Sequence, residues 1–165
     1  MLTIRCTHKL LKRLGTEALP EPGHPTNRLG DWYANLVFTR HSRLIICVSE
    51  RSLLPVLVEA RDFPSFIARF QEAVRSVLRH IGAASELLDS EAREMDQITI
   101  GATVNRRVLG SLNDLASLAR FTMAERATST LPRSQSSSRT RLVRRSINYE
   151  TPRTVSLALL SRAYS

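Results

Sequence analysis

The first side chains whose types suggest chemistry are a thiol and an imidazole two positions apart, Cys6 and His8. Nucleophilic catalysis requires a nucleophile, a base within hydrogen-bonding distance and a group that orients the base. We expect a helix to begin at Thr7, which separates the two side chains. The other histidines fall in a predicted loop, a turn and a helix end: His24, His41 and His80. None of these spacings is typical of a metal site, so we predict neither a catalytic pair nor a bound metal.

Two carboxylates three positions apart, Glu91 and Glu94, are the next candidates, on a short polar helix predicted over 85–95. Paired carboxylates act as general acid and base when their surroundings separate their pKa values. Here Arg93 lies between them, and we interpret the segment as a solvated helix surface. The sequence has neither the pattern GxGxxG nor GxxxxGK followed by Ser or Thr. We therefore predict no nucleotide cofactor, and no other cofactor is indicated.

The segment NRRVLGSLNDL, residues 105–115, is the richest polar cluster of the chain, on a helix predicted over 105–123 and capped by Asn105. We favour a helix surface with ion pairs, each contributing about 0.2–0.5 kcal/mol. The alternative is a recognition face for a partner, or a buried polar link to Asn35. The candidate binding residues are Asn35, Asn105, Arg106, Arg107, Asn113 and Asp114. An unrecognised enzyme would have its polar site at Arg106, Asn113 and Asp114.

The only Trp of the chain stands beside a Tyr in the segment TNRLGDWYANLVFTR, residues 26–40. Exposed aromatic rings can stack on nucleic-acid bases, usually with basic side chains nearby. Because side chains alternate along a strand, Trp32 and Tyr33 point to opposite faces, and no basic residue lies within 31–39. We therefore predict a core strand that buries both rings.

The elements that position these residues follow from hydrophobic periodicity. Apolar alternation or continuous apolar runs predict strands at 2–5, 31–39, 44–49, 55–60 and 97–103. Helical spacing predicts helices at 7–14, 63–81, 85–95 and 105–123. Pro55 fits only the start of its strand or a sheet edge. The predicted fold is α+β: a small, mostly antiparallel sheet with a meander at 31–60, packed by the helices 63–81 and 105–123.

Charge is unevenly distributed along the chain. The formal net charge is +9, but residues 1–125 carry 16 Lys and Arg against 14 Asp and Glu, and residues 126–165 carry 8 Arg against Glu150 alone. We predict a compact α+β domain at 1–125, a flexible Ser/Arg-rich basic linker at 126–147 and a C-terminal helix at 148–165 that docks back on the domain or stays apart from it. The linker either binds nucleic acid electrostatically or is a variable, solvated insert. Its arginines are Arg133, Arg139, Arg141, Arg144 and Arg145.

Cys6 and Cys47 are the only cysteines, and both lie in apolar runs. We predict two buried free thiols, as is usual in a reducing compartment. Residues 1–15 contain too many basic side chains for the apolar core of a signal peptide. The longest uncharged apolar runs, LIICV and LLPVLV, are far shorter than the roughly 20 residues that span a bilayer. We therefore expect a cytoplasmic protein without a membrane partner.

Three segments together resemble a family of small bacterial proteins classed as a domain of unknown function. They are LTIRCTHKLLKRLG, TNRLGDWYANLVFTRHSRLIICVSERSLLPVLV and EMDQITIGATVNRRVLGSLNDLASL. The resemblance covers roughly 1–120 and resumes at INYETPRTVSLALL, so the basic stretch between them departs from the family pattern. It implies a compact bacterial α+β domain, with no agreed activity and no assigned catalytic residues.

Three hypotheses for function follow. The first is a non-enzymatic bacterial binding or accessory protein that acts through a protein partner, because no catalytic, metal or nucleotide pattern stands out. The second is a nucleic-acid-associated protein that uses the Arg-rich stretch 133–145. The third is an enzyme with its site in the helix 105–123.

Overall fold

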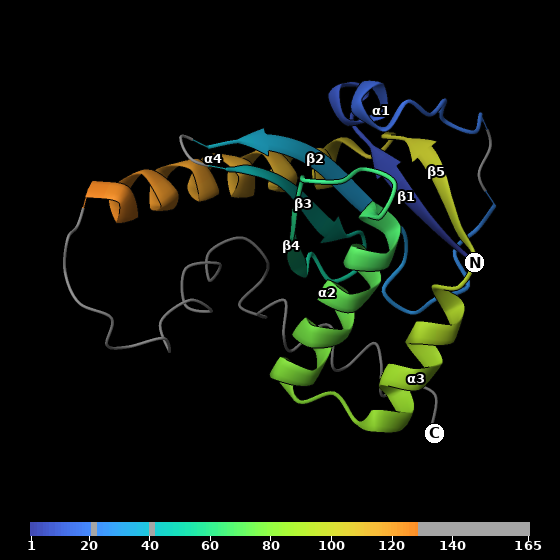
Figure 1. The fold of residues 1–165 in the computed structure, drawn as a ribbon. Coiled ribbons are helices and arrows are strands. Elements are labelled where there is room, and N and C mark those ends of the chain that lie inside the picture. The colour runs from blue at the N-terminus through green and yellow to red at the C-terminus, as the bar shows by residue number, and fades with distance from the viewer. Residues whose placement is uncertain (21–22, 40–41, 129–165) are drawn as a thin grey trace.

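Five strands form one mixed sheet, shown in Figure 1 from a computed structural model that describes residues 1–20, 23–39 and 42–128. Along the chain they are β1 (Leu2–Cys6), β2 (Trp32–Phe38), β3 (Arg43–Ser49), β4 (Pro55–Glu59) and β5 (Ile98–Ala102). Their order across the sheet is β4-β3-β2-β1-β5. β4 and β5 are therefore the two edge strands.

The strands β2, β3 and β4 form the antiparallel meander that the sequence predicts at 31–60. β1 is parallel to both of its neighbours, β2 and β5. The α+β class is confirmed, but the sheet is mixed where we expected it to be mostly antiparallel. The reason lies in the connections: α1 (His8–Leu14) precedes β2, and α2 (Phe66–Ile81) and α3 (Ser85–Glu94) precede β5. Long crossovers through helices return the chain to the same end of the sheet and allow parallel pairing.

One face of the sheet, here called the α2 face, packs against α2 and α3. Apolar residues of α2 recur at helical spacing and are buried: Phe66, Phe70, Val74, Leu78 and Ile81. Trp32 of β2 is fully buried among them, and its ring meets that of Phe70 edge to face with 5.2 Å between centroids. The helix ends at Gly82, whose φ of 88° is the left-handed conformation that glycine adopts readily.

The opposite face, here called the α4 face, packs against α4 (Arg106–Thr128), which Figure 1 shows on the other side of the sheet from α2. Val108, Leu112 and Ala116 of α4 are buried on this face. The strand residues beneath them are Tyr33, Val37, Ile46 and Val48. Trp32 and Tyr33 thus lie in different cores, and the prediction that both rings are buried is confirmed.

The helix α4 continues through residues 126–128, which are the first three of the predicted linker. The rest of that linker, 129–147, and the predicted C-terminal helix, 148–165, lie outside the described residues. Both hydrophobic cores are built from residues between Leu2 and Ala119. The described part of the chain therefore has a core on each face of its sheet.

Candidate functional site

Asn105 caps α4 and connects it to the sheet. Its Oδ1 accepts hydrogen bonds from the backbone N–H groups of Arg107, at 3.0 Å, and Val108, at 3.4 Å. Its Nδ2 donates to Oε1 of Glu50 at 3.2 Å, and its own backbone N–H donates to the hydroxyl of Tyr33 at 3.1 Å. The predicted capping role is confirmed for Oδ1, while Nδ2 and the backbone N–H hold the start of the helix to Glu50, just after β3, and to Tyr33 of β2.

Asn35, the other amide among the candidate residues, belongs to a different contact. Its Oδ1 accepts a hydrogen bond of 3.0 Å from the hydroxyl of Thr7, the residue before α1. Within the described residues, the hydrogen bonds of Asn35 and Asn105 share no partner, so the alternative of a buried polar link between this end of α4 and Asn35 is not formed. Asn35 instead connects β2 to the start of α1.

The remaining candidates on α4 do not converge on a site. Arg106, Arg107, Asn113 and Asp114 are all exposed. None of them lines the pocket described below. The arginines of the nucleic-acid hypothesis, Arg133, Arg139, Arg141, Arg144 and Arg145, lie outside the described residues.

Asp31 joins β1 to the start of β2. Its Oδ2 pairs with Nε of Arg5 at 2.7 Å, and its Oδ1 accepts from the backbone N–H of Thr3 at 3.2 Å. The Asp31 side chain is 1% exposed, while that of Arg5 is 15% exposed and also reaches the carbonyl oxygen of Ala102 in β5. This ion pair therefore joins three neighbouring parts of the sheet, and we assign it a structural role.

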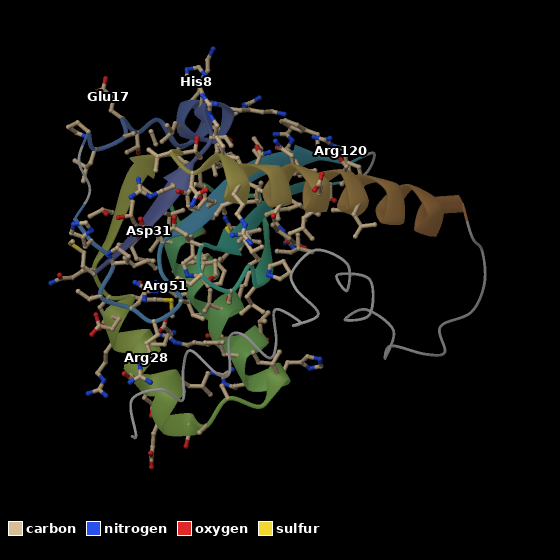
Figure 2. The ribbon with its side chains drawn as sticks, turned by 180° about the vertical axis from the view of Figure 1, so that it is seen from behind. His8, Glu17, Arg28, Asp31, Arg51 and Arg120 are labelled. Carbon is tan, nitrogen blue, oxygen red and sulfur yellow. The ribbon has the colours of Figure 1, made fainter. Side chains whose placement is uncertain are left out.

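Glu91 is not part of a solvated helix surface, as the sequence suggested; it is buried. Its carboxylate accepts hydrogen bonds from Nδ2 of Asn27 at 3.0 Å and from the backbone N–H groups of Arg28 and Leu29 at 3.2 and 3.4 Å. These donors all belong to the loop before β2, and Figure 2 shows Arg28 beside α3 and Asp31 nearer the sheet. The carboxylate is thus used to fix this loop, which explains how an acidic residue is buried.

Glu94 lies in different surroundings from Glu91, so the two carboxylates do not form a pair. It accepts hydrogen bonds from the hydroxyl of Thr26 and, at 3.2 Å, from the N-terminal ammonium group. The Thr26 hydrogen bond, together with the ammonium group, lowers the pKa of Glu94 below its usual range. The lowered pKa of Glu94 is the opposite of what a general acid requires, and the carboxylate of Glu91 is occupied by the loop before β2, so we assign no catalysis to them.

The two cysteines are buried and free, as predicted. Burial raises the pKa of the Cys6 thiol to about 12 and that of Cys47 well above its usual value. The thiolate is the nucleophilic form, so neither cysteine is activated at neutral pH. His8 projects from α1 on the outside of the molecule (Figure 2), away from the buried Cys6.

Two further findings concern the described residues as a whole. They contain no group of three or more His, Cys, Asp or Glu side chains arranged to hold a metal ion. No described helix has both the length and the apolar character needed to cross a membrane.

The outer edge of β4 has polar backbone groups without a described partner. The backbone N–H of Ser49 bonds to the carbonyl of Leu54, and that of Ala60 to the carbonyl of Arg43, so residues 54, 56, 58 and 60 face β3. Because bonding direction alternates along an antiparallel strand, the N–H and C=O groups of Leu57 and Glu59 point away from the sheet. The side chain of Leu57 is 51% exposed and lies on the α4 face, opposite buried Ile46 of β3.

The same end of the sheet has an open pocket of about 610 Å³, here called the hairpin-end pocket. Its lining residues are Phe38, Thr39, Ser42, Arg43, Glu59, Ala60 and Arg61. Phe38 lies opposite Arg43, and Arg43 lies opposite Ala60, so these three form the last cross-strand row of the α2 face. The Phe38 ring is 38% exposed, and the Lys9 ammonium group of α1 lies 4.2 Å from its centre.

The opposite edge of the sheet differs, because residues before the TNRLGD loop lie along β5. The backbone N–H of Leu19 donates to the carbonyl of Ile100 at 2.9 Å, and Leu19 forms a parallel bridge with Gly101. Among the residues that the structure describes, the β4 edge is thus the more open of the two. The sequence indicated this edge through Pro55, but no local pattern singled out Leu57 or the pocket.

A five-stranded mixed sheet with a helical core on each face and one open edge defines a small α+β domain. The chain belongs to the family described as Domain of unknown function (DUF6933), whose model matches residues 3–155. The matched range includes the whole of the basic stretch 126–147, where we expected a departure from the family pattern. Searches of curated proteins and of solved structures find no match.

Proposed function

We propose that this protein is a non-enzymatic binding or accessory protein, and that it binds an extended segment of a protein partner along β4. The observation that carries the proposal is the outer edge of β4, where the N–H and C=O groups of Leu57 and Glu59 face outward. The side chain of Leu57 itself is half-exposed there. Extended peptides add to such edges through main-chain hydrogen bonds, and their side chains provide specificity.

The edge is short, which suits reversible binding. Pro55 begins β4 and has no N–H to offer, so the outward N–H donors of the strand are those of Leu57 and Glu59. Proteins usually protect open edges with proline, charge or short strands, and β4 has all three features. Leu57 is the exception, since an apolar side chain on such an edge gains stability when a partner covers it.

We place this function in the cytoplasm. The support for this is chemical: Cys6 and Cys47 are free thiols, which fits a reducing compartment. The carboxylate and amide side chains of α4 that an enzyme would have used are exposed and line no described pocket, so we propose no reaction.

The test uses random eight-residue peptides displayed on phage and selected against the full-length chain. Binding of a selected peptide will slow hydrogen exchange at the Leu57 and Glu59 amides, because these gain partners, while Val56 and Val58 already bond to β3. Leu57→Lys will abolish binding, whereas Val104→Lys, which alters another exposed apolar residue, will not. Selected peptides whose binding protects α4 and leaves the Leu57 and Glu59 amides unchanged would exclude the β4 site.

A second candidate function is nucleic-acid binding by residues 133–145, supported by their five arginines and lack of acidic residues. Binding of this kind weakens steeply as salt rises. A chain lacking residues 129–146 will then lose the ability to retard DNA or RNA on a gel at low salt. If the full-length chain itself retards neither, this candidate is removed.

A further inference from the structure

The end of β4 presents a different surface on each face of the sheet. On the α4 face, Leu57 offers an apolar side chain beside Ile46. On the α2 face, three residues further along, Ala60 ends the row that contains Arg43 and Phe38. Since three is an odd number of residues, a strand added along β4 also places side chains three positions apart on opposite faces. One added segment can therefore contact both surfaces.

The hairpin-end pocket and the α2-face row beside it carry excess positive charge. Arg61 of the hairpin-end pocket pairs with Glu59, the only carboxylate among the lining residues. Among the described residues, no carboxylate lies within ion-pair distance of Arg43 or Lys9. Arg43 is exposed at the mouth of the pocket, and Lys9 lies over the ring of Phe38 beside it. The pocket is thus complementary to an anionic side chain.

We propose that the partner segment has an apolar residue and an acidic residue three positions apart. This inference rests on the proposed strand addition at β4. The apolar side chain packs on Leu57, and the carboxylate enters the hairpin-end pocket and pairs with Arg43. Adjacent strands are about 4.8 Å apart, so the added strand lies about 10 Å from the backbone of Arg43, a distance that Arg and Glu side chains together span.

The size of the effect follows from the exposure of the site. A surface ion pair contributes little in water, whereas an Arg–carboxylate pair with two hydrogen bonds is stronger. We therefore expect a preference of about five-fold for Glu over Lys at the pocket position. High salt will reduce this preference, since an open pocket is screened by ions.

The experiment measures the affinity of the full-length chain for three synthetic eight-residue peptides in a Thr/Val background. The first has Leu and Glu three positions apart, the second replaces Glu by Lys, and the third moves Glu to four positions from Leu. The first peptide will bind best, because the spacing of four puts both side chains on one face. Arg43→Glu will reverse the preference to the Lys peptide, whereas Arg120→Glu, at an exposed position on α4, will leave it unchanged.

The outcomes separate the inference from the function on which it rests. If all three peptides bind equally and Leu57→Lys abolishes binding, strand addition holds and the acidic specificity is wrong. If none binds, both fail. If the chain is a dimer in solution that Leu57→Lys dissociates, the occupant of the edge is a second copy, and the inference is also wrong. Trp32 fluorescence will verify that each variant is folded, since this ring is fully buried.

Discussion

At the level of single residues, the polar side chains inside this domain act as connectors. Glu91 holds the loop before β2, Asp31 joins the start of β2 to Arg5 of β1, and Asn105 joins α4 to Tyr33 and Glu50. Each connects segments that are distant in the sequence. A buried carboxylate is stable only when donors replace its water, and both acids meet that condition.

Removing the charge of Glu91 tests this role. In Glu91→Gln one acceptor oxygen becomes an NH₂ group that faces N–H donors of the loop, so a buried polar contact is lost. We expect the free energy of unfolding to fall by about 2 kcal/mol, as for hydrogen bonds to charged groups. Urea unfolding followed by Trp32 fluorescence measures it. Asp89→Asn, an exposed change on the same helix, is the control and will have an effect below about 0.5 kcal/mol.

Tyr33 leads to a prediction about alkaline pH. Burial, and then the negative charge of Glu50, raise the pKa of Tyr33 above its ordinary value of 10.0. Above pH 10 the unfolded chain therefore ionises this group before the folded protein does, so the wild-type protein loses stability as pH rises through that range. Below pH 10 the contribution of the neutral Tyr33 side chain to the stability of the fold is fully present.

The variant Tyr33→Phe has no hydroxyl to ionise, so it does not share this loss of stability above pH 10. It also lacks the hydroxyl contacts to Glu50 and to the Asn105 amide. At pH 7 we expect the variant to be less stable by about 1 kcal/mol. The difference in the free energy of unfolding between wild type and variant will become smaller as pH rises above 10. Urea unfolding at pH 7, 9 and 10.5 compares them, and a gap that widens with pH would contradict the assignment.

At the level of elements, the sequences of α2 and α4 differ in how well they suit a packed helix. The apolar residues of α2 recur without interruption from Phe66 to Ile81. In α4 a glycine stands in the second turn of the helix, at position 110, on its exposed side. A Cβ added to Gly110 would meet no atom within 4 Å, so close packing does not require glycine there.

Gly110→Ala is therefore expected to stabilise the protein. Alanine loses less backbone entropy than glycine in a helix, and the free energy of unfolding should rise by about 1 kcal/mol. The matched control is Gly30→Ala, because Gly30 has φ of 75° and a Cβ there would lie 2.9 Å from Cγ of Arg51. That variant should lose roughly 1–2 kcal/mol. Thermal unfolding of both proteins distinguishes the two glycines.

The elements themselves were largely predictable, because each has a local pattern. The stripe from Phe66 to Ile81 predicted α2, and alternation predicted the burial of Trp32 and Tyr33. Parallel pairing of β1 was not predictable, since a short apolar strand has no local signal for its neighbours. The burial of Glu91 was missed for the same reason: its partners lie more than 60 positions away along the chain.

For the whole molecule, the two faces and the two edges of the sheet have different roles. α4 covers one face over β2 and β3, α2 covers the other face mainly over β4, and Leu19 lies along β5, which leaves the outer edge of β4 open among the described residues. From the sequence, Pro55 fitted either the start of its strand or a sheet edge, and the structure has it at both. The exposed Leu57 and the row of Phe38, Arg43 and Ala60 depend on strand register, which local patterns do not define.

Truncated chains define how much of the sequence belongs to the cooperative folding unit. Both described cores lie between Leu2 and Ala119, while the family match continues to residue 155. If the cores suffice for folding, a chain of residues 1–128 will unfold cooperatively in urea. Its single Trp will keep the blue-shifted emission of a buried ring, because Trp32 and Phe70 remain in contact.

A shorter chain of residues 1–104 provides the contrast, because it lacks α4. Without that helix, Tyr33, Val37, Ile46 and Val48 become exposed apolar surface. At about 1.5–3 kcal/mol for each side chain, exposing these four costs roughly 6–12 kcal/mol, which is comparable to the 5–15 kcal/mol by which typical domains are stable. We therefore expect the 1–104 chain to lose cooperative unfolding and the 1–128 chain to keep it. Loss of cooperativity in both would mean that residues 129–155 belong to the folding unit, as the span of the family match allows.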